Sequence, residues 1–225
     1  VEGGAFTMGR VEQDIMYDWN NIPRRVTIPS FYMDETEISN LDYREYLHWL
    51  VRVFESYPEV HTNALPDTLV WRRRLAYNEP YVEYYLRHPA YKDYPVVGVN
   101  WNQAVDYCVW RTDRVNEQIL IEQKIFEPNP GQIDAENFNT DAYLAGQYQG
   151  IEGKNPVTKE TSDGEETRNV RIEDGIMLPK YELPTEAQWE YAALGLIGNS
   201  ADERVFNRKL YPWNGHYVRN DTKKY

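Results

Sequence analysis

Residues that could carry redox or metal chemistry are few and widely spaced in this chain of 225 residues. The one cysteine, Cys108, falls on the apolar face of an expected helix, where a thiol is usually an inert packing group. A single cysteine excludes an internal disulfide and a cysteine-based metal cluster. The histidines lack the spacing of metal ligands, so we expect structural roles for all four: His48, His61, His88 and His216. No catalytic, cofactor-binding or metal-ligating residue is predicted.

Three further motifs carry charge or glycine. The carboxylates of Asp34-Glu35-Thr36-Glu37 would point in different directions in a strand or turn, which favours a structural role over acid–base catalysis. Arg72-Arg73-Arg74 is interpreted as a solvated face, with a docking patch for an acidic partner as the alternative. Gly3-Gly4 indicates a turn rather than a phosphate loop, because no Gly-Lys-Ser/Thr follows.

The composition limits the classes of partner. Hydrophobic residues make up 41% and charged residues 27%, which is typical of a globular protein with one sizeable domain or two small ones. A formal net charge of −12 argues against nucleic acid, since neutralising phosphates needs a basic surface. No apolar run approaches the roughly 18 residues that span a bilayer, so no transmembrane helix is predicted.

The strongest sequence signals for the start of a helix lie near residue 185. Pro184 prevents an earlier beginning, and Thr185 and Gln188 have the spacing of a capping box. Trp189, Ala192 and Ala193 are expected to form the apolar face of this helix.

Two more helices and several short strands are expected earlier in the chain. A helix over 39–54, with Ser39 and Asp42 at capping-box spacing, would bury a stripe at helical spacing. A second helix is expected over 101–115, with Asn100 and Gln103 at the same spacing. Short strands are predicted at 5–8, 26–28, 31–33 and 94–99. The stripe of the first helix consists of Tyr43, Leu47, Leu50, Val51 and Phe54.

Residues 112–179 are interpreted as a long surface insertion. Their second half is rich in turn residues and has little apolar periodicity, so we expect no second core there. Long irregular insertions are often functional, and loops on a rigid scaffold commonly carry recognition. If the insertion contacts partners, deleting 125–170 is expected to spare folding and abolish complex formation.

Ordered motifs along the chain resemble the formylglycine-generating-enzyme, or sulfatase-modifying-factor, domain family. The similarity covers nearly the whole chain except 112–179. The strings that carry it are Gly3-Gly4-Ala5-Phe6-Thr7-Met8-Gly9, Phe31-Tyr32-Met33-Asp34-Glu35-Thr36-Glu37-Ile38-Ser39-Asn40 with Tyr43, Tyr94-Pro95-Val96-Val97-Gly98-Val99-Asn100-Trp101-Asn102-Gln103-Ala104 through Tyr107-Cys108-Val109-Trp110, Leu183-Pro184-Thr185-Glu186-Ala187-Gln188-Trp189-Glu190-Tyr191-Ala192-Ala193 and Tyr211-Pro212-Trp213.

This resemblance implies an α+β fold of the C-type-lectin-like kind, with little regular secondary structure. It implies a single, incomplete domain over 1–225, whose C-terminal part is missing from this sequence. Enzymes of the family oxidise a substrate cysteine with a pair of cysteines that bind copper, and that pair and the calcium sites would lie beyond Tyr225. No cofactor is therefore expected within the 225 residues.

Within the superfamily, the N-terminal half most resembles the GldJ group of gliding-motility lipoproteins, relatives of GldK and PorK in the type IX secretion system. The run from Met16 to Val26, leading into 31–37, carries this similarity. It implies a non-catalytic scaffold on the periplasmic side of the outer membrane, with protein partners from the secretion and gliding machinery. The lipid-bearing cysteine would lie upstream of Val1. Two alternatives stay open: an active formylglycine-generating oxidase, and a lectin-like module that binds glycan or peptidoglycan.

Overall fold

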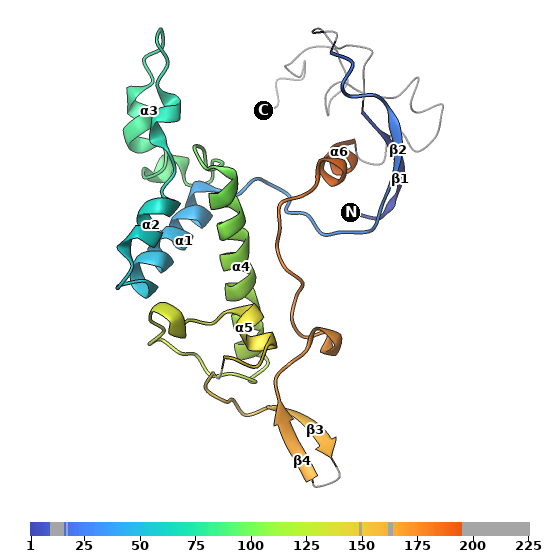
Figure 1. Ribbon diagram of the computed structural model, residues 1–225. Helices are drawn as coiled ribbons and strands as arrows, with labels where there is room; N and C mark the ends of the chain where they lie inside the picture. The colour runs from blue at the N-terminus through green and yellow to red at the C-terminus, as the bar shows by residue number, and fades with distance from the viewer. Residues whose placement is uncertain (10–15, 17, 149, 162–163, 195–225) are drawn as a thin grey trace. The chain divides into compact units, whose positions relative to one another are not determined.

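The computed structural model describes residues 1–9, 16, 18–148, 150–161 and 164–194 (Figure 1). The chain divides into two compact units, Val1–Glu35 with Pro184–Tyr225, and Thr36–Leu183. In the described residues, each unit combines helices with a two-stranded antiparallel sheet. This mixed content agrees with the expected α+β class.

In the first unit, a hairpin and one helix share a small core. Strand β1 (Gly4–Met8) pairs with β2 (Arg24–Ile28), in a register that places Phe6 opposite Val26. The Tyr191 ring from helix α6 (Glu186–Leu194) lies 5.1 Å from the ring of Phe6. The predicted strands at 5–8 and 26–28 are confirmed, whereas 31–33 forms no strand.

Helix α6 begins as predicted but buries a different face. The Gln188 amide donates to Thr185 Oγ1 at 3.2 Å, and the Thr185 amide donates to Gln188 Oε1 at 2.8 Å. Trp189, expected in the apolar face, is 63% exposed, whereas Tyr191 is 1% exposed. The buried face contains Tyr191 with Ala187 and Leu194, because these side chains meet the hairpin.

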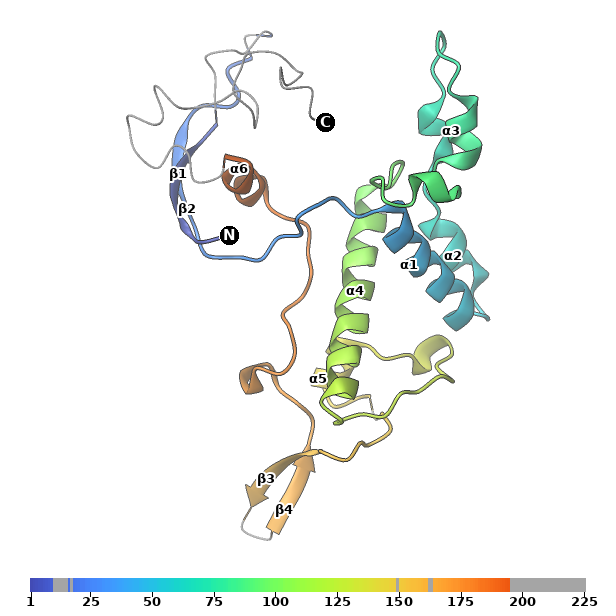
Figure 2. The ribbon, with the colours of Figure 1, turned by 180° about the vertical axis from the view of Figure 1, so that it is seen from behind.

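The second unit is a string of short helices around one long one. Helix α4 is the longest, and α1 lies beside it in both views (Figures 1 and 2). In chain order the elements are α1 (Asn40–Val53), α2 (Pro58–Ala64), η1 (Thr68–Trp71), α3 (Glu79–Tyr84), η2 (Pro89–Tyr91), α4 (Trp101–Glu122), η3 (Asp134–Glu136), α5 (Thr140–Leu144), β3 (Val157–Thr161), β4 (Gly164–Arg168) and η4 (Ile172–Asp174).

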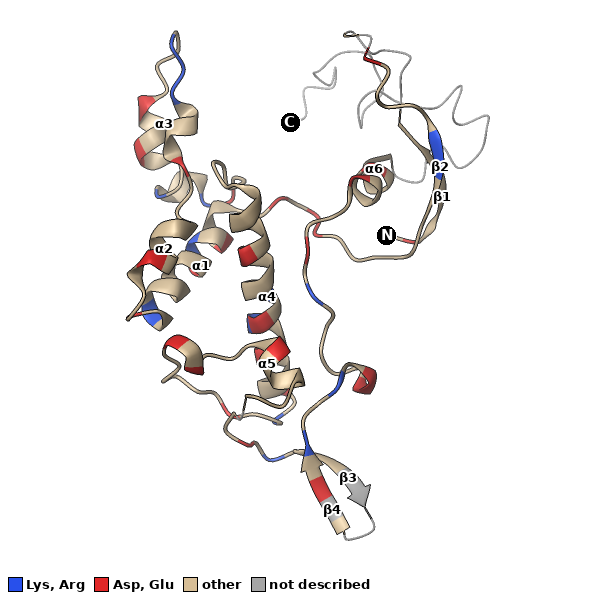
Figure 3. Cartoon of the chain, in the orientation of Figure 1, with Lys and Arg blue, Asp and Glu red and all other residues tan. Residues whose placement is uncertain are grey.

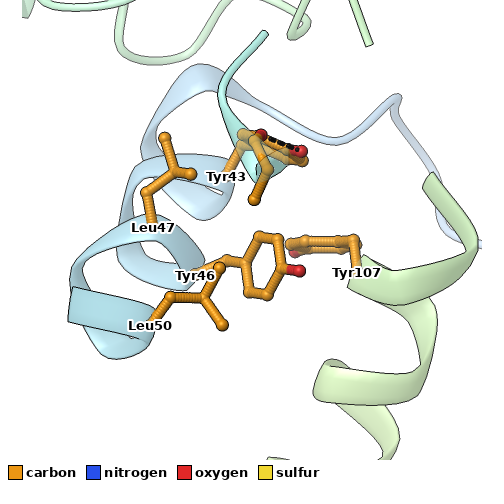
Figure 4. Close-up of a cluster of buried hydrophobic side chains, with 6 residues drawn as sticks. Tyr43, Tyr46, Leu47, Leu50 and Tyr107 are labelled. Atoms are coloured by element: carbon orange, nitrogen blue, oxygen red, sulfur yellow. Dashed lines mark hydrogen bonds between the residues drawn. The ribbon is translucent and has the colours of Figure 1, made fainter. Parts of the chain in front are cut away.

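A tyrosine cluster joins α1 to α4 (Figure 4). The rings of Tyr43 and Tyr46 lie 5.6 Å from the ring of Tyr107, and the Tyr43 hydroxyl donates to the Ala64 carbonyl at 2.8 Å. The predicted helix over 39–54 is confirmed, including its capping box. One member of its predicted stripe is wrong: Val51 is 54% exposed, and Tyr46 is buried in the cluster.

This cluster predicts a loss of stability in alkali. Burial raises the pKa of Tyr46 to about 12, with a smaller contribution from Asp106, and burial likewise raises the pKa of Tyr43. An unfolded tyrosine ionises near pH 10, so the folded state holds its proton more tightly. The stabilisation is therefore complete below about pH 10 and is lost as the pH rises towards the folded value.

Urea unfolding from pH 8 to 12 measures this loss of stability. Tyr46→Phe should make the loss smaller by about 2–3 kcal/mol, the free-energy equivalent of the Tyr46 pKa shift. An unchanged alkaline slope in Tyr46→Phe would contradict the assignment.

Around α4, the structure corrects two predictions. The predicted helix over 101–115 continues to Glu122, because its second half supplies buried side chains such as Asn116 and Leu120 to the insertion. The predicted strand over 94–99 is reduced to a single bridge between Ser39 and Pro95.

Residues of the insertion form a core, contrary to the expectation from the sequence. Six buried side chains cluster there, and aromatic rings pack among them at 5–6 Å; the six are Leu120, Ile125, Phe138, Tyr143, Val170 and Met177. Deleting 125–170 would remove four of the six, so the fold is not expected to survive that deletion. This core could not be predicted from hydrophobic periodicity, because its side chains come from separate loops rather than from one helix or strand.

Two glycines with similar backbone angles differ in the space around them. Gly98 has φ of +86°, and a Cβ there would lie 2.2 Å from the Asp67 carbonyl oxygen. Gly146 has φ of +74°, with no heavy atom within 4 Å of its added Cβ. Gly146→Ala is therefore expected to cost about 1 kcal/mol, and Gly98→Ala about 3 kcal/mol or more, because the Asp67 backbone must also move. Equal losses of unfolding free energy would refute this difference.

Candidate protein-interaction site

The C-terminal half of α4 caps helix α5 of the insertion. Asp113 Oδ1 accepts a hydrogen bond from the Thr140 amide at 2.8 Å, and its Oδ2 accepts from Asn139 Nδ2 at 3.2 Å. Asn139 in turn accepts from the Ala142 amide at 2.9 Å. Because Asp113 and Thr140 are buried, these bonds satisfy amides that water cannot reach.

Two other polar side chains of α4 hold the far end of the insertion. Asn116 accepts from the Leu178 amide at 2.9 Å and donates to the Leu178 carbonyl at 3.2 Å. One turn earlier, Thr112 Oγ1 accepts from the Tyr181 amide at 2.9 Å. The Arg111 guanidinium lies 4.3 Å from the centre of the Tyr181 ring, a cation–π contact. The chain leaving the insertion is thereby fixed along α4.

Arg114 is the centre of a partly buried charged network. Its guanidinium lies 4.6 Å from the centre of the Trp49 ring, pairs with Glu117 at 2.7 Å and donates to the Phe138 carbonyl. Gln132 donates to Glu117 and accepts from the Phe138 amide at 2.9 Å. Burial lowers the pKa of Arg114, and Glu117 opposes that effect. A charge in such a place is tolerated because it is paired and hydrogen-bonded.

A second ion pair closes the loop after β4. Arg168 binds both carboxylate oxygens of Asp174, at 2.7 and 2.8 Å, and the Arg171 amide donates to the same carboxylate at 2.9 Å. The Arg168 hydrogen bonds hold the pKa of Asp174 well below its usual range. The Tyr143 hydroxyl accepts from the Val170 amide at 2.7 Å, which fixes this loop to α5.

These contacts make the insertion a defined surface on a firm support. Acidic residues lie on η3, α5 and η4 (Figure 3): Asp134 is half-buried, and Asp141 and Glu173 are exposed. Large apolar side chains are exposed among them: Ile133, Leu144, Ile151, Ile172 and Leu178. Preformed loops of this kind are suited to recognition, because little conformational entropy is lost on binding.

The structure places the cysteine, the histidines and the acidic motif of the sequence analysis in separate elements. Cys108 is half-buried in α4, His48 is exposed on α1, and His61 is half-buried in α2. His88 caps η2 by accepting from the Ala90 amide at 3.1 Å. All four residues of 34–37 are exposed outside any helix or strand. His216 and the motif Tyr211-Pro212-Trp213 lie outside the described residues.

Neither a metal site nor a membrane span is found in the part of the chain that the structure describes. There, no three His, Cys, Asp or Glu side chains are grouped so that they could hold a metal ion. Within the same ranges, no helix is long and apolar enough to cross a bilayer.

Sequence reasoning missed the polar residues that hold the insertion. Asp113 and Asn116 are three residues apart on one face of α4. The buried Leu120 follows Asn116 by four residues on the same face. Polar side chains at that spacing are normally interpreted as a solvated face, and nothing in one sequence marks them as buried.

Together, the fold and this site define a mixed helix-and-strand domain with a large, firmly held irregular insertion. The sequence matches the family described as "Sulfatase-modifying factor enzyme 1-like domain" over residues 1–225. The chain therefore belongs to this FGE-sulfatase domain family.

Curated relatives include enzymes and a protein named as inactive. The chain is 28% identical over 138 residues to the formylglycine-generating enzymes of Mus musculus and Bos taurus, covering 51% of this chain and 36% and 35% of theirs. It is 30% identical over 139 residues to the "Inactive C-alpha-formylglycine-generating enzyme 2" of Mus musculus, covering 51% and 42%. The match thus spans well under half of each relative. No solved structure matches the chain.

Proposed function

We propose that this protein is a non-catalytic scaffold for type IX secretion and gliding motility, of the GldJ, GldK and PorK kind. In this proposal it is an outer-membrane lipoprotein facing the periplasm, and its lipid anchor is attached outside these 225 residues. It acts by assembling protein partners of the secretion and gliding machinery.

The observation that carries this proposal is the attachment of the insertion to α4. Asp113, Asn116 and the Arg114 network fix a large irregular segment to α4, and that segment also exposes acidic and apolar residues. An assembly protein needs a firmly held surface of this kind, because its partners must find the same groups each time. The inactive mouse relative supports the proposal, because its name records a member of the family without the activity.

The 225 residues contain one cysteine, and it is half-buried in a helix. Oxidation by the cysteine-pair chemistry of the family would need a pair from outside these residues.

The formylglycine-generating oxidase is the main alternative, and a peptide assay separates it from the scaffold. Full-length protein is incubated with copper, oxygen and a peptide containing a sulfatase-type cysteine, beside an active formylglycine-generating enzyme as control. We expect mass spectrometry to find the cysteine unchanged. Conversion to formylglycine at a rate near that of the control would reject the scaffold proposal.

A lectin-like module that binds glycan or peptidoglycan is the second alternative. It rests on the C-type-lectin-like fold that the family resemblance implies and on seven tryptophans and nineteen tyrosines. Function depends on sites rather than folds, so this support is weak. We expect no binding of the full-length protein to purified peptidoglycan, and saturable binding would favour this alternative.

A further inference from the structure

The segment 69–84 forms a projecting hairpin and helix that the scaffold proposal leaves without a role. We call this segment the finger. It contains most of η1, the turn that follows and all of α3, and Figure 3 shows its arginines in blue beyond α3. Its turn is closed by a bridge between Arg73 and Ala76, with the Ala76 amide donating to the Arg73 carbonyl at 3.2 Å.

The base of the finger is firmly built. The Trp71 ring lies 4.6 Å from that of Tyr85 and 5.3 Å from that of Tyr81. Asn78 Nδ2 donates to the Trp71 carbonyl at 3.1 Å, and Arg72 Nε donates to both oxygens of Glu79 at 3.1 and 3.2 Å. The first arginine of the run is thus used internally, and the tip is presented by an ordered support.

The tip itself exposes apolar and cationic groups together. Leu75 is 98% exposed and Tyr77 is 88% exposed. Arg73 and Arg74 come directly before Leu75 in the chain, and no carboxylate among the described residues forms an ion pair with either guanidinium. Four more large apolar side chains are exposed along the finger: Leu69, Val70, Tyr81 and Tyr84. Leaving so many apolar groups in water within one short segment is typical of an interaction site.

We propose that the finger docks onto an acidic surface of a partner protein, with Leu75 and Tyr77 entering an apolar depression between carboxylates. Arginine and tyrosine are the residues enriched at the centres of protein interfaces. A guanidinium can bind a carboxylate through two parallel hydrogen bonds, and the tip offers two that are not paired within the described chain. The proposal rests on the assembly function above and assigns part of it to these residues.

Charge favours a protein over a lipid surface as the occupant. Recognition of anionic lipid uses clusters of about four to eight Lys and Arg, whereas the tip has two arginines that form no ion pair with the described part of the chain. An acidic partner needs only a short-range match at the tip, since salt screens charges beyond about 8 Å.

A photocrosslinking experiment in the cells that make the full-length protein tests this. A benzophenone amino acid replaces Tyr77, and the same probe at Val51, exposed on α1, is the control. We expect an adduct with another protein at position 77, mapped by mass spectrometry to a segment rich in Asp and Glu. Arg73→Glu with Arg74→Glu should lower its yield at least about tenfold, whereas Arg25→Glu on β2 should leave it unchanged.

Folding of each variant is checked by its melting temperature, which should not change because the altered side chains are exposed. An adduct that survives charge reversal, an adduct with lipid or with a second copy of the chain, or no adduct at all would overturn the proposal. If the wild-type protein still co-purifies with secretion components in those cases, only the finger is rejected. If it co-purifies with none, the proposed function fails as well.

Discussion

Tyr43→Ala is expected to lower the free energy of unfolding by about 4 kcal/mol, the largest effect of any single substitution that we consider. The side chain is 1% exposed, stacks on Tyr107 and donates to the Ala64 carbonyl. Its loss would open a cavity where α1, α2 and α4 meet and leave a buried carbonyl without its donor. Urea unfolding followed by far-UV circular dichroism measures the change.

Tyr43→Phe separates the hydrogen bond from the packing. It keeps the ring and removes only the hydroxyl, so a loss of about 1–2 kcal/mol is expected. Val51→Ala, on the exposed side of the same helix, should cost less than about 0.5 kcal/mol beyond the small change in helix propensity. A Tyr43→Ala variant as stable as Val51→Ala would show that the tyrosine cluster does not hold these helices together.

Asp113→Ala is expected to cost about 3 kcal/mol and to loosen the insertion. It removes the acceptor of the buried Thr140 amide and of Asn139, so two donors lose their partner at once. Hydrogen exchange at Thr140 and Ala142 should speed up more than exchange in α1, because the first helical turn of α5 is released.

Two controls make the Asp113 result specific. Gln118→Ala lies on the exposed side of α4 and should change stability by less than about 0.5 kcal/mol. Asp113→Asn keeps one acceptor oxygen, so its loss should be smaller than that of alanine. Uniform acceleration of exchange over the whole 36–183 unit would contradict the local attachment that we infer.

Helix starts were predictable from the sequence because their signals are local. Ser39 with Asp42, Asn100 with Gln103 and Thr185 with Gln188 all form the expected reciprocal hydrogen bonds. A capping box needs only two side chains three residues apart, so one sequence contains the whole signal.

Features that depend on distant contacts were not predictable. The core of the insertion joins Leu120 to Met177 across loops without a period, and the buried face of α6 depends on where the hairpin meets it. The end of α4 was misplaced for the same reason, since Asp113 and Asn116 look like surface residues until the insertion covers them.

The central claim, an assembly scaffold rather than an enzyme, is tested most directly by co-purification. Full-length protein is isolated from its native outer membrane, with a strain lacking it as control, and the associated proteins are quantified by mass spectrometry. The account predicts enrichment of type IX secretion or gliding components in a stable complex. Recovery of the protein alone, together with oxidation of a sulfatase-type cysteine peptide by the same preparation, would contradict it and identify an enzyme.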